Sequence, residues 1–485
     1  MRFAILPMGK ELWRCDLSRR MGKKKPGYVL SLEFTLCLNL LSKGIISFMC
    51  CKHVCLCCCY TGLEIMVIKG KNMKKMISFT LTLFLTGCTF FSYAQQLHYT
   101  AKESWMIHDS INQSRWDIGG RLSHYTFRYM SEFFPVGIIQ PSDNPFLFDY
   151  GPDKSIDNIS VESKSGTLTF EDYLKKLHIS GFIVVHKGTI VHEKYFSMLP
   201  KDQHTLQSIT KVVTSTLVTN LINSHKVDID QTIDKYIPEL ANTDWQGISV
   251  RDILNMRTGM DSKSIDFSSG PFTNPQHKNY QLESALGALP KADTTPTSVY
   301  EFIRGLKKDK DSGLTAEYSN INTFVLGWLA EVVTGRKYAD LLTELIWKPM
   351  GASSSAYVCL SDHGAAWTHG GMSATLRDLA RFGMLFTKSE IRKHNESLIS
   401  FSQIKEIFDA PPIENSPVPF KWAYQWDIAS DGIMVKGGFG GQALYIHPEK
   451  EIVIAYFNYV DKNWGIDNRI SEKVSKDIIQ AIEID

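Results

Sequence analysis

Strand-like segments stand at both ends of the region that begins near residue 166, and a largely helical stretch separates them. Near its start, β-branched and aromatic residues fill 179–185 and 190–196 on either side of a Lys-Gly turn, which is typical of a strand pair. Strands are expected again at 420–428, 432–436, 442–447 and 451–459. Helices are expected at 170–177, 209–225, 250–256, 322–333, 338–347, 375–386 and 468–484. This order predicts an α+β sandwich: one antiparallel sheet built from both ends of the domain, flanked by helices, with a mostly helical subdomain inserted.

The composition is that of an ordinary globular protein. Of the 485 residues, 44% are hydrophobic and 21% are charged, which excludes wholesale disorder and a polytopic membrane protein. Lys and Arg number 53 against 51 Asp and Glu, a formal net charge of +2. Nothing in this balance favours a surface for nucleic acid or another polyanion.

Cysteine usage separates the first residues from the rest. Eight of the ten cysteines lie within the first 59 residues, and the remainder of the chain holds only Cys88 and Cys359. The crowded string at 55–59 lacks the second ligand pair that a zinc knuckle needs. We therefore interpret 1–72 as an N-terminal extension outside the working protein, and expect neither a metal site nor a disulfide framework.

Residues 73–94 have the features of an export signal. Met73-Lys74-Lys75 precedes a short apolar run at 76–85, which is too short to span a bilayer as a mature helix. Two processing sites remain possible. Leu85-Thr86-Gly87-Cys88 resembles a bacterial lipobox, and Ser92-Tyr93-Ala94 resembles an ordinary cleavage site. We expect an exported protein, either periplasmic or attached to the bacterial envelope through a lipidated Cys88.

The exported chain divides into a lead-in and a main domain. Residues 95–165 are polar, rich in aromatic residues and weakly periodic, and we expect them to wrap the domain at 166–485. Within that domain, 262–290 is interpreted as an ordinary surface loop; the alternative is a substrate-contacting insertion in which Tyr280 is the candidate contact. His369 is interpreted as a structural histidine.

The first string that could carry chemistry is Ser208-Ile209-Thr210-Lys211, which opens a predicted helix. Residues i and i+3 share a helix face, so the lysine can reach the serine hydroxyl. A lysine in a partly desolvated cleft loses its proton easily and can activate that serine. Alone the string is weak evidence, because an N-cap serine with a solvated lysine is then the better explanation and Ser402-Gln403-Ile404-Lys405 matches the string by chance.

Two further strings follow. Tyr318-Ser319-Asn320 precedes a buried helix, where a tyrosine can pass a proton and an asparagine can hold an amide, although a helix cap beside a packed ring is an equal explanation. Lys436-Gly437-Gly438 lies on a C-terminal strand, where glycines permit a ligand to approach the backbone or simply form a bulge. A dinucleotide fingerprint at 438–443 is excluded because a strand, and no helix, follows it.

Taken together and in this order, the three strings resemble the motifs of the serine β-lactamase and penicillin-binding protein superfamily. Strings at 206–211, 250–260 and 370–383 are similar to its class C-like branch, and especially to 6-aminohexanoate-dimer hydrolases and related esterases. The resemblance covers about residues 110–485. It implies a β-lactamase/transpeptidase-like fold and a serine hydrolase without metal, nucleotide or flavin.

The resemblance also implies roles for single residues. Ser208 would be the nucleophile, and Lys211 with Tyr318 would serve as the general base. The backbone N–H groups of Ser208 and of a residue near Phe439 would form the oxyanion hole. Asn320 would orient the substrate amide or Lys211. The substrate-binding residues would be Asn320, Lys436, Gly437, Gly438 and Phe439.

One departure from the family pattern bears on the substrate. The third motif reads Lys-Gly-Gly where β-lactamases carry Lys-Thr-Gly, so the hydroxyl that meets a β-lactam carboxylate is absent. We expect a small-molecule ester or linear amide as substrate. A D,D-peptidase or peptidoglycan-active amidase is the alternative among enzymes, and a catalytically silent binding domain is the alternative outside them.

Overall fold

The computed structural model describes residues 99–111, 116–117, 119–163, 166–264, 269–396, 398–410, 421–429, 431–459 and 469–483. Every described residue belongs to one compact unit, 93–485. The predictions for the extension at 1–72 and the signal at 73–94, including Cys88, concern residues outside those described.

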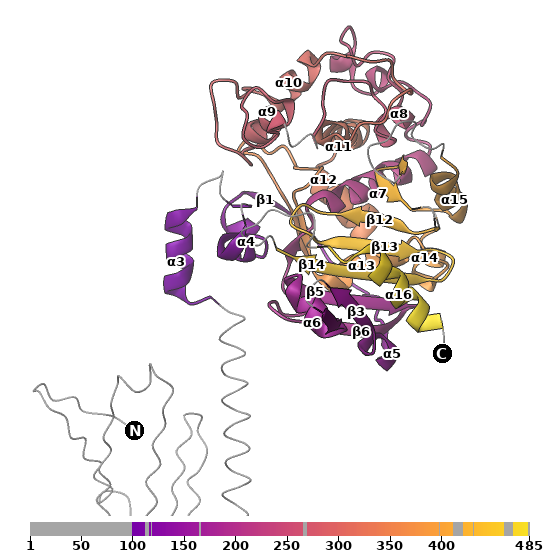
Figure 1. The fold of residues 1–485 in the computed structure, drawn as a ribbon. Coiled ribbons are helices and arrows are strands. Elements are labelled where there is room, and N and C mark those ends of the chain that lie inside the picture. The colour runs from indigo at the N-terminus through magenta and orange to yellow at the C-terminus, as the bar shows by residue number, and fades with distance from the viewer. Residues whose placement is uncertain are drawn as a thin grey trace, which may run out of the picture. The chain divides into compact units, whose positions relative to one another are not determined.

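An eight-stranded sheet forms the centre of the domain (Figure 1). Its strands, in spatial order, are β10 (Lys421–Ala423), β11 (Trp426–Ile428), β12 (Met434–Gly437), β13 (Ala443–His447), β14 (Ile452–Asn458), β5 (Ile179–His186), β6 (Thr189–Tyr195) and β2 (Asp149–Tyr150). Every neighbouring pair is antiparallel except β2 and β6, which run parallel. The last strand, β14, pairs with β5 from the start of the domain, as Ile454 opposite Val184 illustrates. The predicted sheet built from both ends is confirmed.

The hairpin between β10 and β11 corrects one prediction. A single strand was expected over 420–428, but the chain reverses at Tyr424 and Gln425, whose φ angles are 51° and 69°. No Asn-Gly or Gly-Gly pair announces this turn. The Gln425 side chain stabilises it by donating to the carbonyls of Ile253 and Leu254 and accepting from the Thr323 hydroxyl. These tertiary bonds override the local preference against positive φ.

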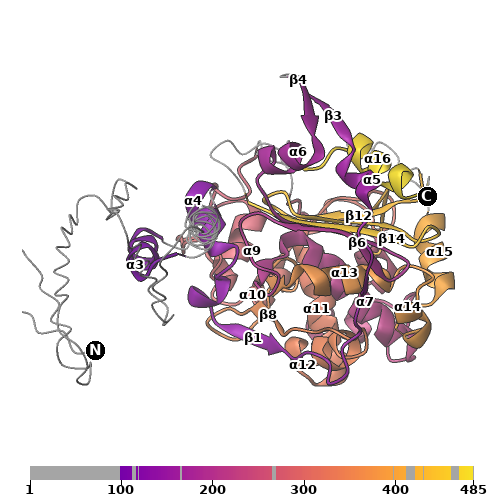
Figure 2. The same cartoon turned by 90° about the horizontal axis from the view of Figure 1, so that it is seen from below.

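Helices cover both faces of the sheet (Figure 2). One face packs against α5 (Lys154–Asp157), α6 (Phe170–Lys176) and α16 (Glu472–Glu483). The other is covered by α7 (Thr210–Asn223) and α13 (Leu376–Met384), and α11 (Asn320–Thr334) packs on α7. Because side chains alternate along a strand, β5 contributes Phe182 and Val184 to the first core and Ile183 and Val185 to the second. Burial on both faces explains the continuous apolar run of this strand.

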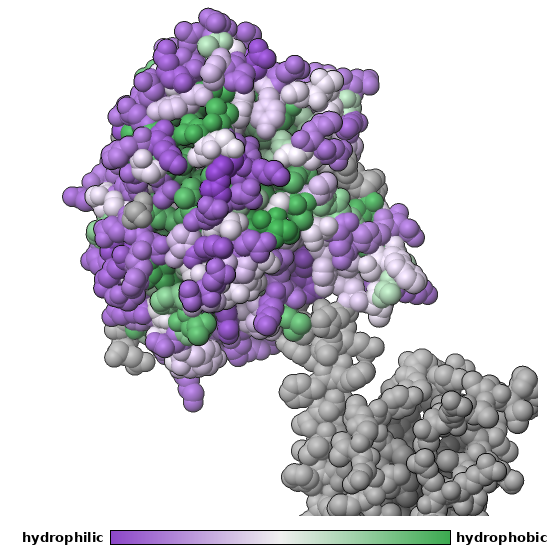
Figure 3. All heavy atoms as spheres, turned by 180° about the vertical axis from the view of Figure 1, so that it is seen from behind, coloured by the Kyte–Doolittle hydropathy of each residue, from purple (hydrophilic) through white to green (hydrophobic). Residues whose placement is uncertain are grey.

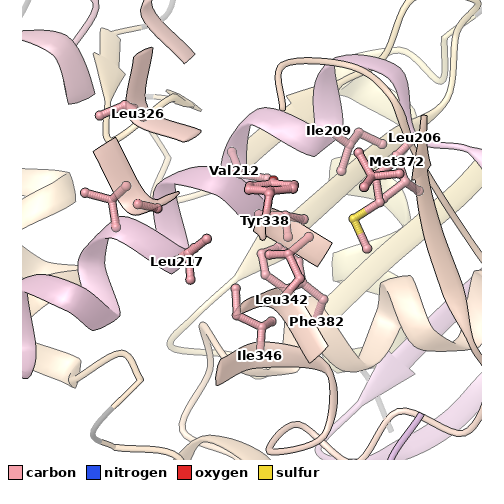
Figure 4. Close-up of a cluster of buried hydrophobic side chains, with 14 of the residues drawn as sticks. Leu206, Ile209, Val212, Leu217, Leu326, Tyr338, Leu342, Ile346, Met372 and Phe382 are labelled. Atoms are coloured by element: carbon pink, nitrogen blue, oxygen red, sulfur yellow. The ribbon is translucent and has the colours of Figure 1, made fainter. Parts of the chain in front are cut away.

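Helix α7 lies in the larger core, and all but three of its 14 residues are buried. Its side chains Val212 and Leu217 lie with Tyr338, Leu342 and Ile346 (Figure 4). A helix buried on all sides has little freedom to shift, so the residues at its first turn are held firmly.

The segment between the two strand sets forms the helical subdomain. It contains α8 (Val250–Leu254), α9 (Lys278–Leu286), α10 (Val299–Gly305), α11, α12 (Tyr338–Leu342) and a π-helical turn, Thr343–Trp347. Beside it lies a four-stranded sheet that the sequence did not predict, in the order β1 (Val136–Ile139), β8 (Ala356–Cys359), β9 (Met372–Ala374) and β7 (His204–Thr205). The remaining elements are α3 (Ala101–Ser110), α4 (Gly120–Thr126), β3 (Ser160–Ser163), β4 (Gly166–Thr169), α14 (Glu390–His394), α15 (Phe401–Asp409) and the 3-10 turns Met130–Glu132, Gln207–Ile209, Ile233–Lys235 and Pro238–Leu240.

Hydrophilic side chains cover most of the face shown in Figure 3, with small hydrophobic areas between them. Among the described residues, no helix has the length and apolar character that crossing a membrane requires.

A pair of glycines tests how the subdomain is held. Gly259 and Gly335 have nearly the same φ, 69° and 67°, but a Cβ at Gly259 would overlap the carbonyl oxygen of Lys310, whereas a Cβ at Gly335 meets nothing within 4 Å. We expect Gly335→Ala to lower the free energy of unfolding by about 1 kcal/mol through its positive φ alone. Gly259→Ala should lower it by about 3 kcal/mol or more, because the overlap adds to the φ cost. Urea unfolding of both variants measures this, and equal losses would contradict the close approach.

Candidate active site

Ser208 lies in the 3-10 turn Gln207–Ile209 that leads into α7. Gln207 has a φ of 50°, an uncommon value for a residue other than glycine, and this bend leaves Ser208 partly exposed at the helix start. One turn on, Lys211 is fully buried, and its Nζ lies 3.2 Å from Ser208 Oγ and 2.7 Å from the carbonyl oxygen of His369. The spacing i and i+3 therefore brings the two side chains together, as predicted.

Tyr318 joins the same cluster from the residue pair before α11. Its side chain hydrogen-bonds Ser208, and its ring centroid lies 5.1 Å from Lys211 Nζ and 5.0 Å from Lys436 Nζ. Burial raises the pKa of the Tyr318 hydroxyl, against the opposing effects of the Ser208 hydrogen bond and the Arg469 charge. At neutral pH the phenol therefore keeps its proton and can donate it.

Lys436 enters from β12, and its side chain is almost completely buried. Its Nζ lies 3.2 Å from Asp427 Oδ1 on β11. Burial lowers the pKa of Lys436, the Asp427 carboxylate opposes that shift, and Arg469 adds to it. The sequence prediction placed Lys436 in this site but did not include Asp427.

The charges around Lys211 favour its neutral amine. Burial lowers its pKa well below the usual value of 10.5, repulsion from Lys436 adds to the shift, and Glu283 and Asp427 oppose it. Lys436 and Arg469 already offset Glu283 and Asp427, so a proton on Lys211 would leave the cluster with an unmatched buried charge. A neutral amine at 3.2 Å from a serine hydroxyl can accept its proton.

The glycine run after β12 lies against the nucleophile turn. A Cβ at Gly438 would come within 2.5 Å of the Leu206 carbonyl oxygen, so only glycine allows this approach. At Gly437 the same position is filled by the Arg469 guanidinium, whose Cζ would lie 2.6 Å from a Cβ. Phe439 follows in the turn, with its ring 5.5 Å from that of Phe272.

Asn320, the first residue of α11, lies in the site but binds other partners than predicted. Its side-chain nitrogen donates to Asn279 Oδ1 at 2.8 Å and to Glu283 Oε1 at 3.0 Å. Asn320 reaches Lys211 only indirectly, because Glu283 also binds the ring of His369, whose carbonyl holds the lysine.

The interpretation of 262–290 as an ordinary surface loop is wrong. The segment contains α9, on which Asn279 is fully buried and Glu283 is only 8% exposed, and both face Asn320. The apolar residues Leu282 and Leu286, which lie four residues apart, were the available signal. Tyr280 packs inside the segment, where its hydroxyl donates to the Pro290 carbonyl. His369 does have a structural role, but its carbonyl also binds Lys211.

Among the residues that the structure describes, no group of three or more His, Cys, Asp or Glu side chains could hold a metal ion. The site therefore consists of a hydroxyl, two buried lysines and a phenol, with carboxylates behind them.

A family model described as Beta-lactamase matches residues 169–465, which is more than half of the chain. The chain belongs to the beta-lactamase family of serine hydrolases. It is 28% identical over 294 residues to the 6-aminohexanoate-dimer hydrolase of Paenarthrobacter ureafaciens, covering 59% of this chain and 73% of that one. It is 25% identical over 173 residues to a "Putative D-alanyl-D-alanine carboxypeptidase" of Escherichia coli (strain K12), covering 36% of this chain and 38% of that one.

Comparison with solved structures confirms the fold of this family member. The structure described as "Putative 6-aminohexanoate-dimer hydrolase from Bacillus anthracis" aligns with a TM-score of 0.66 at 23% identity, covering 78% of this chain and 96% of that one. The predicted β-lactamase/transpeptidase-like fold, the family and the assignment as a serine hydrolase are thus confirmed.

Removal of the buried lysine tests the charge argument through stability. In the unfolded chain Lys211 takes up a proton below about pH 10, whereas in the fold it stays neutral to a lower pH, so the unfolded state binds more protons between these values. Lys211 therefore weakens the fold progressively as the pH falls. The free energy of unfolding of Lys211→Met, minus that of the wild type, should therefore increase as the pH is lowered from 10 to 7. Urea unfolding at several pH values measures this difference.

Lys405→Met on α15 is the matched control, because Lys405 is exposed and occupies the same position in the chance string that begins at Ser402. The difference in free energy of unfolding between this control and the wild type should not change with pH. If the difference for Lys211→Met were also independent of pH, a depressed pKa for Lys211 would be contradicted.

Proposed function

We propose that this family member hydrolyses an ester or a linear amide through an acyl-serine intermediate on Ser208, with Lys211 as the general base and Tyr318 as the proton donor beside it. The observation that carries the proposal is the fully buried Lys211 amine at 3.2 Å from Ser208 Oγ. A binding domain has no need of a nucleophile and a desolvated base in contact, because the burial of the lysine weakens the fold.

The proposed acylation follows from these contacts. As Ser208 Oγ forms a bond to the substrate carbonyl carbon, its proton passes to the neutral Lys211 amine. Tyr318, hydrogen-bonded to Ser208, delivers its phenolic proton to the leaving alcohol or amine and regains one from Lys211. Water repeats the sequence on the acyl-enzyme and releases the acid. The N–H groups of Ser208 and Phe439 would stabilise the oxyanion, a role supported by the approach of Gly438 to Leu206.

The third motif supports a substrate other than a β-lactam. The hydroxyl of a Lys-Thr-Gly motif has no counterpart at Gly437, and Arg469 fills the space that such a side chain would occupy. The similarity to a protein named 6-aminohexanoate-dimer hydrolase supports a linear amide or ester. The similarity to the carboxypeptidase of Escherichia coli keeps D-amino-acid peptides as the second candidate class.

Fluorophosphonate labelling tests the nucleophile. We expect wild-type protein to gain one phosphonyl group on Ser208, located by peptide mapping, and Ser208→Ala to gain none while its free energy of unfolding changes by no more than about 1–2 kcal/mol. In Lys211→Met the labelling rate should fall by about a thousandfold, because the base is lost.

Ser402→Ala serves as the control, since Ser402 begins the chance copy of the string and is exposed on α15. Its labelling should match the wild type. A folded wild-type protein without label on Ser208 would favour a silent binding domain. With label established, nitrophenyl esters, short linear amides and D-amino-acid peptides separate the substrate classes.

We further propose that the protein is exported, with Cys88 lipidated or with cleavage before Gln95. The support is the basic, apolar and small-residue order of 73–94. Radiolabelled fatty acid should enter the protein in bacterial cells and be lost in Cys88→Ala if the lipobox is used. A labelled Cys88→Ala protein would contradict lipidation at this residue, and a mature N-terminus at Gln95 would identify the ordinary cleavage site.

A further inference from the structure

Glu283 is a buried carboxylate that the proposed reaction does not use. It lies on α9 with 8% of its surface exposed, and a single oxygen, Oε1, accepts from Asn320 Nδ2 and His369 Nε2, each at 3.0 Å. The described residues place no lysine or arginine in an ion pair with it. A buried carboxylate without a lysine or arginine in direct contact is costly, so its position in the site needs a reason.

The bond to His369 reaches Lys211 through the backbone. Glu283 Oε1 binds His369 Nε2, and within the described part of the chain Nδ1 of the same ring is buried without a hydrogen-bond partner. The ring is thereby fixed in one orientation. The carbonyl of His369 is the closer of the two acceptors of Lys211 Nζ, at 2.7 Å against 3.2 Å for Ser208 Oγ. Glu283 thus anchors the residue that holds the base.

The same segment also contacts the backbone on either side of the Tyr318 side chain. Before α9, the backbone N–H of Ser264 donates to the Tyr318 carbonyl at 3.0 Å, and the Ser264 hydroxyl accepts from the Asn320 N–H at 2.9 Å. Within α9, Asn279 Oδ1 is the second acceptor of the Asn320 side chain. The segment 262–290 therefore contacts the supports of both Tyr318 and Lys211.

The charged groups around Lys211 come from several elements. Lys436 on β12 repels a proton on the amine, while Asp427 on β11 and Glu283 on α9 attract one. Arg469 acts on Lys436 and Tyr318, and the Tyr318 ring centroid lies 5.1 Å from Lys211 Nζ and 5.0 Å from Lys436 Nζ. Asp117, from the lead-in, faces Glu283; burial raises the pKa of Asp117 to about 7, and the charge of Glu283 acts in the same direction. Of the two negative charges that act on Lys211, Asp427 alone has a lysine in contact among the described residues.

We propose that Glu283 is a positioning residue for the general base: it fixes the His369 carbonyl that holds Lys211, and its charge sets the pH range in which Lys211 accepts the serine proton. This inference rests on the proposed acyl-serine function. Through it, the inserted helix α9 becomes part of the machinery that activates Ser208, although α9 contributes no reacting atom.

The experiment compares Glu283→Gln with Asn279→Ala by the pH dependence of Ser208 phosphonylation, measured by intact mass. Gln keeps an oxygen that can accept from Asn320 and His369 but removes the charge, so Lys211 should deprotonate more easily and the acid limb should move to lower pH by about one unit. Asn279→Ala removes the neutral acceptor of Asn320 and leaves the charge. Its rate should fall while the acid limb stays at the wild-type pH.

A second pair of variants tests the anchoring separately and remains informative if Glu283→Gln fails to fold. His369→Ala removes the ring that Glu283 holds, and the plateau rate should fall about tenfold or more through misplacement of Lys211. In His369→Gln the side-chain amide can again donate to Glu283, and most of the rate should return. Equal rates for His369→Ala and wild type would overturn the anchoring role.

The outcomes separate the two proposals. Wild-type protein without label on Ser208 would refute the acyl-serine function itself. Label on wild-type Ser208, with an acid limb that is identical in folded Glu283→Gln, would leave that function intact and overturn the role of Glu283. A limb that moves equally in Glu283→Gln and Asn279→Ala would show general disturbance of the site and would also overturn it.

Discussion

The pairing of β5 with β14 is the contact on which the site depends. It joins strands that lie more than 260 residues apart in the chain, with Val184 opposite Ile454 and Phe182 opposite Tyr456. Because β12 and β13 follow on the β14 side, this pairing carries Lys436 to the first turn of α7, where Ser208 and Lys211 lie. The large apolar cores on both faces make the pairing stable, since each buried side chain contributes about 1.5–3 kcal/mol.

This stable frame allows the site to hold groups that would otherwise oppose folding. Lys211 and Lys436 are both buried, and each lowers the stability that its surroundings provide. Compensation comes from hydrogen bonds rather than from direct ion pairs alone: Lys211 binds a serine and a backbone carbonyl, while Lys436 pairs with Asp427. The result is an amine with a lowered pKa next to a hydroxyl, which is the condition for a neutral base.

The segment 262–290 shows how an insertion enters such a frame. Its buried polar groups are joined to Asn320 and His369, so the insertion cannot move without disturbing the supports of the base. Segments that connect the strands and helices of a fold often carry functional groups, because the rigid scaffold positions them. In this protein the insertion contributes electrostatics and positioning.

Local patterns in the sequence determined much of this picture. The period-two and continuous apolar runs predicted the strands at both ends, and the i and i+3 spacing placed Lys211 beside Ser208. These local patterns failed where hydrogen bonds to residues distant in the sequence determine the backbone conformation. The turn at Tyr424 and Gln425 is held by bonds to Ile253, Leu254 and Thr323, and no residue type at the turn announces it.

Only the tertiary structure decided the partners of the reacting groups. The Lys211 acceptor is a backbone carbonyl at residue 369, which any residue type would supply, so no motif can encode it. Glu283 and Asp427 act on Lys211 from elements far away in the chain, and Arg469 lies over Gly437 in the same way. The sequence by itself thus determined which groups can react, because hydroxyl, amine and phenol are properties of residue types. Their protonation and orientation depend on burial and on neighbouring charges, and these exist only once the chain has folded.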